Sequence, residues 1–266
     1  MAVGLFAGSC VNREPAGATL ILATTTSTRD SGLLDLLVPR FEQQTGIAVK
    51  VIAVGTGQAL ELGRRGDVDA LLTHAPPAEQ RFMAAGHGAR RQAVMANDFV
   101  LVGPANDPAD VQSVQSIAVA FQRIARTRSA FVSRGDESGT HLKEREVWRQ
   151  ASIKPQAEWY IESGAGMAHA LRIANETEAY TLTDRGTYLA HRDALQLQIV
   201  YQGDSLLRNP YAFIVVSSKK HPGRQQAAAE RFLEFLISSE VQQMIGQFGR
   251  RRFGQRLFIP QTTMEP

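Results

Sequence analysis

Short apolar runs alternate with amphipathic stretches along most of the chain. The apolar runs at residues 19–23 and 49–54 favour strands, and each leads into a turn of hydroxyl or glycine residues. Between them, four apolar residues recur at helical spacing over 33–41, and Gly46 is a natural stop for the helix that this spacing predicts. Pro39 is expected to split or kink that helix. The repeated order of strand, helix and strand predicts a parallel sheet with helices on both faces.

The same alternation continues toward the C-terminus. Further strands are predicted at residues 69–73, 99–102, 130–132, 159–161, 179–182, 197–201 and 212–216, and further helices at 113–125, 140–148, 167–175, shortly after 186, and as a pair within 224–248. The segment 104–108 begins and ends with proline, which is typical of a loop, and it predicts the first crossing between two lobes. The chain is expected to return to the first lobe near 201–211. The expected division is a residual signal or lipoprotein tether at 1–18, lobe 1 at 19–102 and 206–266, and lobe 2 at 103–205.

Composition narrows the class of protein. The 266 residues are 44% hydrophobic and 21% charged, which is typical of a globular chain and argues against a disordered or fibrous one. No segment reaches the roughly 18 consecutive apolar residues that span a bilayer. The net charge of +3 does not indicate a nucleic-acid partner, and the basic runs 250–252 and 90–91 are interpreted as solvated surface.

Cys10 is the only cysteine, so no disulfide within the chain can form. Residues 5–9, just before it, are small or apolar and resemble the end of a bacterial lipoprotein signal. Two interpretations stay open, a lipid on Cys10 and an incidental terminal cysteine. Either way we expect a periplasmic or extracytoplasmic protein that associates with a membrane only through such a lipid.

Small hydroxyl and glycine residues recur between a strand and a helix at 24–27, 56–57, 138–140 and 163–166. A helix N-terminus carries unpaired N–H groups and partial positive charge, so such loops can bind an anion. For any single loop the alternative is an ordinary N-cap. Four loops of one chemistry, with Arg134 as a fixed positive charge, favour a shared anionic ligand.

Three strings, 24–27, 54–59 and 133–140, resemble in order and separation the substrate-binding proteins of tungstate ABC importers. The similarity extends from about residue 20 to about residue 260. It implies an α/β periplasmic-binding-protein fold, type II-like, with two lobes that each hold a mainly parallel sheet flanked by helices and that enclose the ligand in the cleft between them. It also implies an ABC permease and its ATPase as partners, and we expect a monomer.

The resemblance and the loops together predict a set of oxyanion contacts. They are Thr25, Thr26, Ser27, Thr56, Arg134, Ser138, Gly139, Thr140 and Gly166, with Thr25 preferred in the first loop. The expected ligand is tungstate or molybdate, with neither a cofactor nor a bare metal cation. Both anions are fully deprotonated at neutral pH and only accept hydrogen bonds, whereas hydrogen phosphate also needs an acceptor. We expect Asp136 to turn away from the ligand and brace its loop or cap the helix.

The sequence also bears on three other classes of protein. A receptor for phosphate or another oxyanion shares the arginine, serine, glycine and threonine of 134–140. A hydrolytic enzyme is disfavoured because the six histidines lack paired ligand spacing and neither G-x-S-x-G nor a phosphate-binding P-loop occurs. His141 as a general base and the Ser217 and Lys220 pair are weak exceptions, so no catalytic residue is predicted. A DNA-binding regulator would need a helix-turn-helix, for which the 18 residues before the first strand leave no room.

Overall fold

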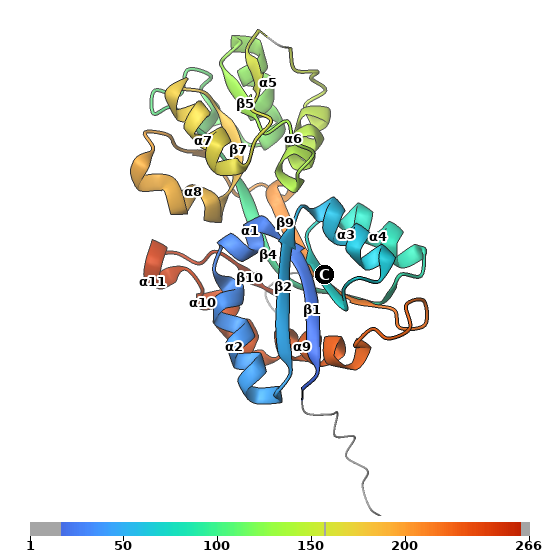
Figure 1. The fold of residues 1–266 in the computed structure, drawn as a ribbon. Coiled ribbons are helices and arrows are strands. Elements are labelled where there is room, and N and C mark those ends of the chain that lie inside the picture. The colour runs from blue at the N-terminus through green and yellow to red at the C-terminus, as the bar shows by residue number, and fades with distance from the viewer. Residues whose placement is uncertain (1–16, 157, 262–266) are drawn as a thin grey trace, which may run out of the picture.

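The computed structural model describes residues 17–156 and 158–261. Two lobes lie one above the other and are joined by the long strands β4 and β9 (Figure 1). In lobe 1 the elements are β1 (Thr19–Thr25), α1 (Thr26–Asp30), α2 (Leu33–Thr45), β2 (Ala48–Val54), α3 (Thr56–Arg65), β3 (Ala70–Thr73), α4 (Pro76–Ala84), α9 (Gln226–Ile237), α10 (Ser239–Gln247), α11 (Arg250–Phe253) and β10 (Ile259–Pro260).

The sheet of lobe 1 has the order β10-β4-β9-β3-β1-β2. β1 pairs in parallel with both β2 and β3, as the alternation of strands and helices predicts. β9 (Arg208–Val216) runs antiparallel to β3 and to β4, and β10 runs antiparallel to β4. The strands that cross between the lobes therefore make the sheet mixed.

β4 (Gly88–Gly103) belongs to both lobes. From Gly88 to Asp98 it pairs with β9, and from Phe99 onward it pairs with β7 (Thr181–Asp184) and β8 (Gln198–Tyr201). One continuous strand thus connects the two lobes. The lobe limits expected from the sequence stay a prediction.

Lobe 2 is built on α5 (Ile117–Thr127), β5 (Phe131–Ser133), α6 (Gly139–Gln150), β6 (Tyr160–Glu162), α7 (Met167–Glu176) and α8 (Arg185–His191), with short 3-10 turns at Val111–Ser113, Arg192–Ala194 and Ser205–Leu207. β5 and β6 pair in parallel, and the amide of Val132 donates to the carbonyl of Tyr180 beside β7. The loop that follows β5 holds Arg134, which lines one cavity together with Thr26 and Ser27 of lobe 1.

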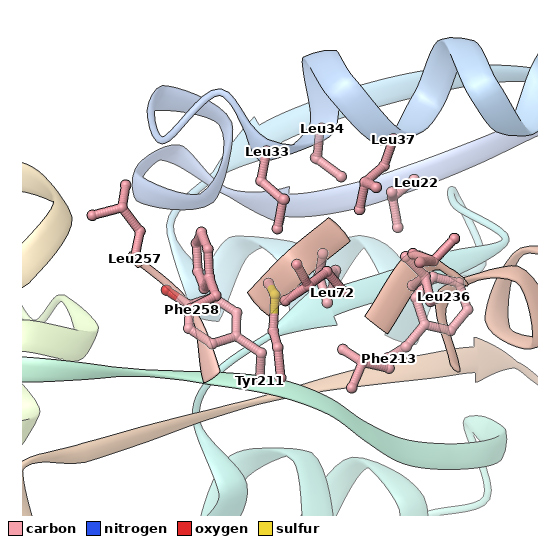
Figure 2. Packing of buried hydrophobic residues seen from close by; sticks show 14 of the residues in the cluster. Leu22, Leu33, Leu34, Leu37, Leu72, Tyr211, Phe213, Leu236, Leu257 and Phe258 are labelled. Atoms are coloured by element: carbon pink, nitrogen blue, oxygen red, sulfur yellow. The ribbon is translucent and has the colours of Figure 1, made fainter. Parts of the chain in front are cut away.

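Two hydrophobic cores hold the lobes. In the larger cluster, Leu33, Leu34 and Leu37 of α2 lie over Tyr211 and Phe213 of β9 (Figure 2). The rings of Phe41 in α2 and Phe232 in α9 are 4.7 Å apart in the same cluster. In lobe 2, the rings of Phe121 and Trp148 lie 4.3 Å apart in a separate aromatic cluster. The larger cluster continues from lobe 1 into lobe 2, where it includes Leu171 and Leu189, so apolar packing also joins the two lobes.

The structure corrects one expectation about local geometry. α2 is a single helix from Leu33 to Thr45 that contains Pro39, so the proline does not split it. Pro39 has no N–H, so the carbonyl of Asp35 one turn earlier loses its helical hydrogen bond. Both residues lie on the exposed side of α2, where water can bind that carbonyl. Gly46 ends the helix in the left-handed conformation, with φ of 72°, as predicted.

Candidate oxyanion site

A cavity of about 470 Å³ lies between the lobes, with walls from α1 and the segment around α11 on one side and from the loop after β5, α7 and α8 on the other. Four predicted contacts line it: Thr26, Ser27, Arg134 and Gly166. Five are absent from its lining: Thr25, Thr56, Ser138, Gly139 and Thr140. The structure thus brings together predicted contacts from three loops that are far apart in the sequence.

The hydroxyl loop ends β1 and begins α1. Thr25 is buried and acts as the N-cap of α1, where its Oγ1 accepts from the amide of Thr28 and lies 2.7 Å from the Thr28 hydroxyl. Its Oγ1 also lies 3.2 Å from Oγ of Ser27. Thr26 and Ser27 are the residues of this run that face the cavity, and Thr25 supports them from behind.

Arg134 follows β5 and supplies a fixed positive charge to the cavity wall. Its side chain is 17% exposed, and one of its guanidinium nitrogens pairs with the Asp136 carboxylate. Its Nε is buried and has no hydrogen-bond partner in the described part of the chain. An unpaired buried donor costs roughly 1–3 kcal/mol, so this nitrogen is available to an incoming acceptor.

Asp136 braces the loop that holds Arg134. Its Oδ1 accepts from the backbone amide of Ser138, while Oδ2 pairs with Arg134. Burial raises the pKa of this carboxyl, but hydrogen bonds from Ser138 and the charge of Arg134 outweigh that effect and hold the pKa below its usual value. Asp136 is therefore ionised, with its oxygens engaged inside its own loop.

The N-terminus of α7 opens directly onto the cavity. Gly166 occupies the N-cap position with no side-chain cap, and the first turn of α7 holds no acidic residue. Met167 and Ala168 also line the cavity. Their backbone N–H groups and the positive end of the helix dipole therefore form an anion-binding surface.

The remaining predicted contacts lie outside the cavity lining. Thr56 begins α3 after Gly55, which gives no side-chain cap. Ser138 caps α6 by accepting from the amide of His141, and Thr140 is buried. Gly139 packs against lobe 1, because a Cβ built on it would lie 2.7 Å from Cε1 of His74.

Two arginines that the sequence did not single out for the site also line the cavity. Arg172 lies in α7 and donates to Nδ1 of His169 at 2.8 Å. Arg252 lies in α11, 4.9 Å from the ring centre of Phe253. It is exposed, as the interpretation of solvated surface predicts, and it also lines the cavity. Neither arginine has an acidic partner within the described residues. No local motif marks them, because only the fold brings α7 and α11 to one cavity.

The carboxylates that line the cavity already accept hydrogen bonds from neighbouring residues. Asp184 caps α8, where it accepts from the amide and the hydroxyl of Thr187 at 2.9 and 2.6 Å. Asp30 accepts from the guanidinium of Arg29. With Arg134 paired and Arg172 and Arg252 unpaired, the cavity has an excess of positive charge and of hydrogen-bond donors.

Two lobes joined by crossing strands, with an electropositive cavity between them, define a binding protein of the periplasmic type. A family model described as a PBP superfamily domain matches residues 12–240. Among the relatives, the "Tungstate-binding protein TupA" of Peptoclostridium acidaminophilum is 45% identical over 94% of this chain and 88% of its own. The chain belongs to the PBP superfamily and, within it, to the family of that tungstate-binding protein.

Solved structures agree with this assignment. The "Tungstate binding protein - TupA" from Desulfovibrio alaskensis G20 superposes with a TM-score of 0.84 at 42% identity, and covers 91% of this chain and 98% of its own. A tungstate ABC transporter protein from Geobacter sulfurreducens gives a TM-score of 0.79 at 45% identity over 86% and 98%. The predicted periplasmic-binding-protein fold is confirmed, and the relatives are binding and transport proteins.

The described ranges hold neither a helix long and apolar enough to cross a bilayer nor a group of three His, Cys, Asp or Glu side chains arranged to hold a metal ion. Cys10, where a lipid was considered, lies outside the described residues.

Proposed function

We propose that the protein binds tungstate, and molybdate by the same chemistry, as the substrate-binding protein of an ABC importer. One observation carries the proposal: the cavity offers hydroxyls, open helix N–H groups and arginines, while its carboxylates are engaged elsewhere. A fully deprotonated dianion accepts hydrogen bonds at every oxygen, so it satisfies such donors without needing an acceptor in return. The names of the relatives point to the same anion.

In this proposal the anion contacts Thr26 and Ser27 from lobe 1 and Arg134 and the Gly166 end of α7 from lobe 2. Thr25 holds Ser27 through the 3.2 Å contact of their hydroxyls. Of the other predicted residues, Thr56, Ser138 and Thr140 complete the wall when the lobes close, and Gly139 leaves room for α6 to approach lobe 1. Arg172 and Arg252 add the charge that draws the anion in.

The protein delivers its ligand to a membrane permease with an associated ATPase and itself carries out no reaction. We place it outside the cytoplasm, as a monomer whose possible membrane anchor is a lipid on Cys10. The lobes are assigned to 19–102 with 206–266 and to 103–205, so that the two crossing strands form the hinge.

Hydrogen phosphate is the main rival ligand. Its proton would need an acceptor, and Asp136 is held by the amide of Ser138 and by Arg134. An unpaired polar group in a closed site costs roughly 1–3 kcal/mol, which is a five- to 150-fold loss of affinity. The same carboxylate charge repels the anion unless Arg134 screens it.

Thermal unfolding of the ligand-stripped protein tests the proposal. A ligand at roughly a thousand times its Kd stabilises the folded state by about 4 kcal/mol, which raises the Tm by several degrees. We expect such a shift with micromolar tungstate or molybdate and a negligible one with millimolar phosphate. An equal shift with phosphate would replace the proposal with a phosphate receptor. The matched control is Arg231→Ala, an exposed arginine of α9 outside the cavity.

A further inference from the structure

A chain of hydrogen-bonded polar side chains, half-buried at His74 and buried at Asn97, Asn209 and Tyr211, crosses the molecule where β4 and β9 pair between the lobes. Nδ1 of His74, in the turn after β3, donates to Oδ1 of Asn209 at 3.0 Å. Asn209 donates to Oδ1 of Asn97 at 2.7 Å, and Asn97 donates to the hydroxyl of Tyr211 at 3.2 Å. Asn97 and Asn209 are register partners on the two crossing strands, and Asn97 also lines the anion cavity.

His74 contacts the other lobe as well as the hinge. A Cβ on Gly139, the first residue of α6, would lie 2.7 Å from Cε1 and 3.2 Å from Nδ1 of His74. Real Cβ atoms do not come within 3.0 Å of another heavy atom in this way, so the imidazole occupies the space that any side chain at 139 would need. His74 is thus the wall of lobe 1 against which α6 of lobe 2 is seated.

The glycine itself supports this interpretation. Gly139 has no positive φ, so the backbone there does not require glycine. Alanine is favoured over glycine within a helix, so helix propensity does not explain the residue either. The remaining explanation for glycine at position 139 is the close approach of the two lobes, because a side chain there would meet the imidazole of His74.

We propose that His74 is a positioning residue for anion binding. It sets how closely α6 packs against lobe 1, and its hydrogen-bonded chain through Asn209 and Asn97 couples this packing to the crossing strands β4 and β9. α6 begins at the end of the loop that holds Arg134. A change in the seating of α6 therefore moves the arginine relative to Thr26 and Ser27 on the opposite wall. This inference rests on the proposed function.

The imidazole acts here by shape and hydrogen bonding. Burial lowers the pKa of His74, and this effect exceeds the opposing hydrogen bond to Asn209 and the charges of Asp184 and Glu79. The ring is therefore neutral near pH 7, and it contributes no charge toward the anion.

A double-mutant cycle between Gly139→Ala and His74→Ala tests the inference, with tungstate as the probe. Gly139→Ala alone should weaken tungstate binding at least tenfold and speed its dissociation, because the new methyl group meets the imidazole and unseats α6. Adding His74→Ala removes the obstacle, so the double variant should bind within about threefold of His74→Ala alone. Effects that simply add would overturn the inference, since Gly139 would then act on the anion directly.

Two controls separate the possible failures. His221→Ala removes an imidazole that packs in the same way against Gly66, whose Cβ would lie 2.7 Å from Nδ1; it should leave tungstate binding unchanged and should not rescue Gly139→Ala. Rescue by His221→Ala would overturn the inference. His74→Gln keeps a donor for Asn209 and should recover part of the affinity that His74→Ala loses, and no recovery would contradict the role of the hydrogen-bonded chain.

The cycle is also measured without ligand, by small-angle scattering. Gly139→Ala should enlarge the radius of gyration of the ligand-free protein, and the double variant should restore it. If the wild type bound no tungstate while this coupling persisted, the proposed function would fail and the seating of α6 by His74 would stand. If tungstate bound and neither readout showed coupling, the inference would fail alone.

Discussion

Replacing Arg134 with alanine should weaken anion binding strongly while leaving the protein folded. The side chain is 17% exposed, its Nε has no partner among the described residues, and its guanidinium is paired with Asp136. Removing it takes away the charged donor and leaves the Asp136 carboxylate beside the cavity without its cation. The pair is partly exposed, so its loss should cost less than about 1 kcal/mol of stability.

The size of the effect follows from the bonds involved. A hydrogen bond from a charged donor contributes about 1.5–3 kcal/mol, and about 1.4 kcal/mol corresponds to a tenfold change in affinity, so Arg134→Ala should raise the Kd for tungstate by about 10- to 150-fold. Repulsion from the unpaired Asp136 favours the upper half of this range. Arg134→Lys should recover only part, because an ammonium group cannot reproduce the planar fork.

Calorimetry on a set of four proteins checks this reasoning. Asp136→Asn frees Arg134 and removes a negative charge, so tungstate binding should stay equal or become several-fold tighter. In the double variant Arg134→Ala/Asp136→Asn the loss should be smaller than in Arg134→Ala alone. Unchanged affinity in Arg134→Ala would remove the arginine from the site. Weakening by Asp136→Asn as large as that by Arg134→Ala would contradict the expected gain and would show that the brace on the Arg134 loop outweighs the repulsion of the anion by the carboxylate.

Small-angle scattering should show compaction when tungstate is added, because an anion held by both lobes stabilises the closed form, and identical profiles would indicate a rigid pocket. Burial raises the pKa of Glu144 to about 7 from 4.5, so the folded state binds more protons between these values. The free energy of unfolding should therefore fall by up to about 1.4 kcal/mol per pH unit as pH rises from about 5 to 7. Urea unfolding measured across this range should show this slope in the wild type and lose it in Glu144→Gln. A slope retained in Glu144→Gln would contradict the raised pKa of Glu144. Phe232→Ala empties a fully buried position against Phe41 and should cost about 3–5 kcal/mol in urea unfolding, whereas a loss below about 1 kcal/mol would contradict the packing.

Much of the fold could be predicted from local patterns. The parallel strands β1, β2 and β3 and the helices between them have strong apolar periodicity bounded by turn residues, and the pair of C-terminal helices is equally clear. The first half of β4 could not be predicted, because residues 88–98 are largely polar or small and lack alternation. That segment is a strand because β9 pairs with it, and this pairing joins residues more than 100 positions apart.

The sequence predicted which loops reach the cavity better than which of their residues face it. Hydroxyl residues before a helix identified the loop at α1, but the sequence could not tell that Thr25 turns inward as the cap while Thr26 and Ser27 face the cavity. Arg252 belongs to a basic run that looks like surface, and only the position of α11 beside the cleft brings it to the cavity. Long-range packing decides these placements, and short motifs carry little information about it.

Titration calorimetry of the ligand-stripped protein with tungstate, followed by competition with molybdate, phosphate and sulfate, tests the central claim most directly. The site geometry predicts one tungstate per chain, displacement by molybdate, and no displacement by phosphate at millimolar concentration. Displacement of tungstate by millimolar phosphate, or the absence of any binding heat and any Tm shift with tungstate, would contradict the claim that this cavity is built for a fully deprotonated oxyanion.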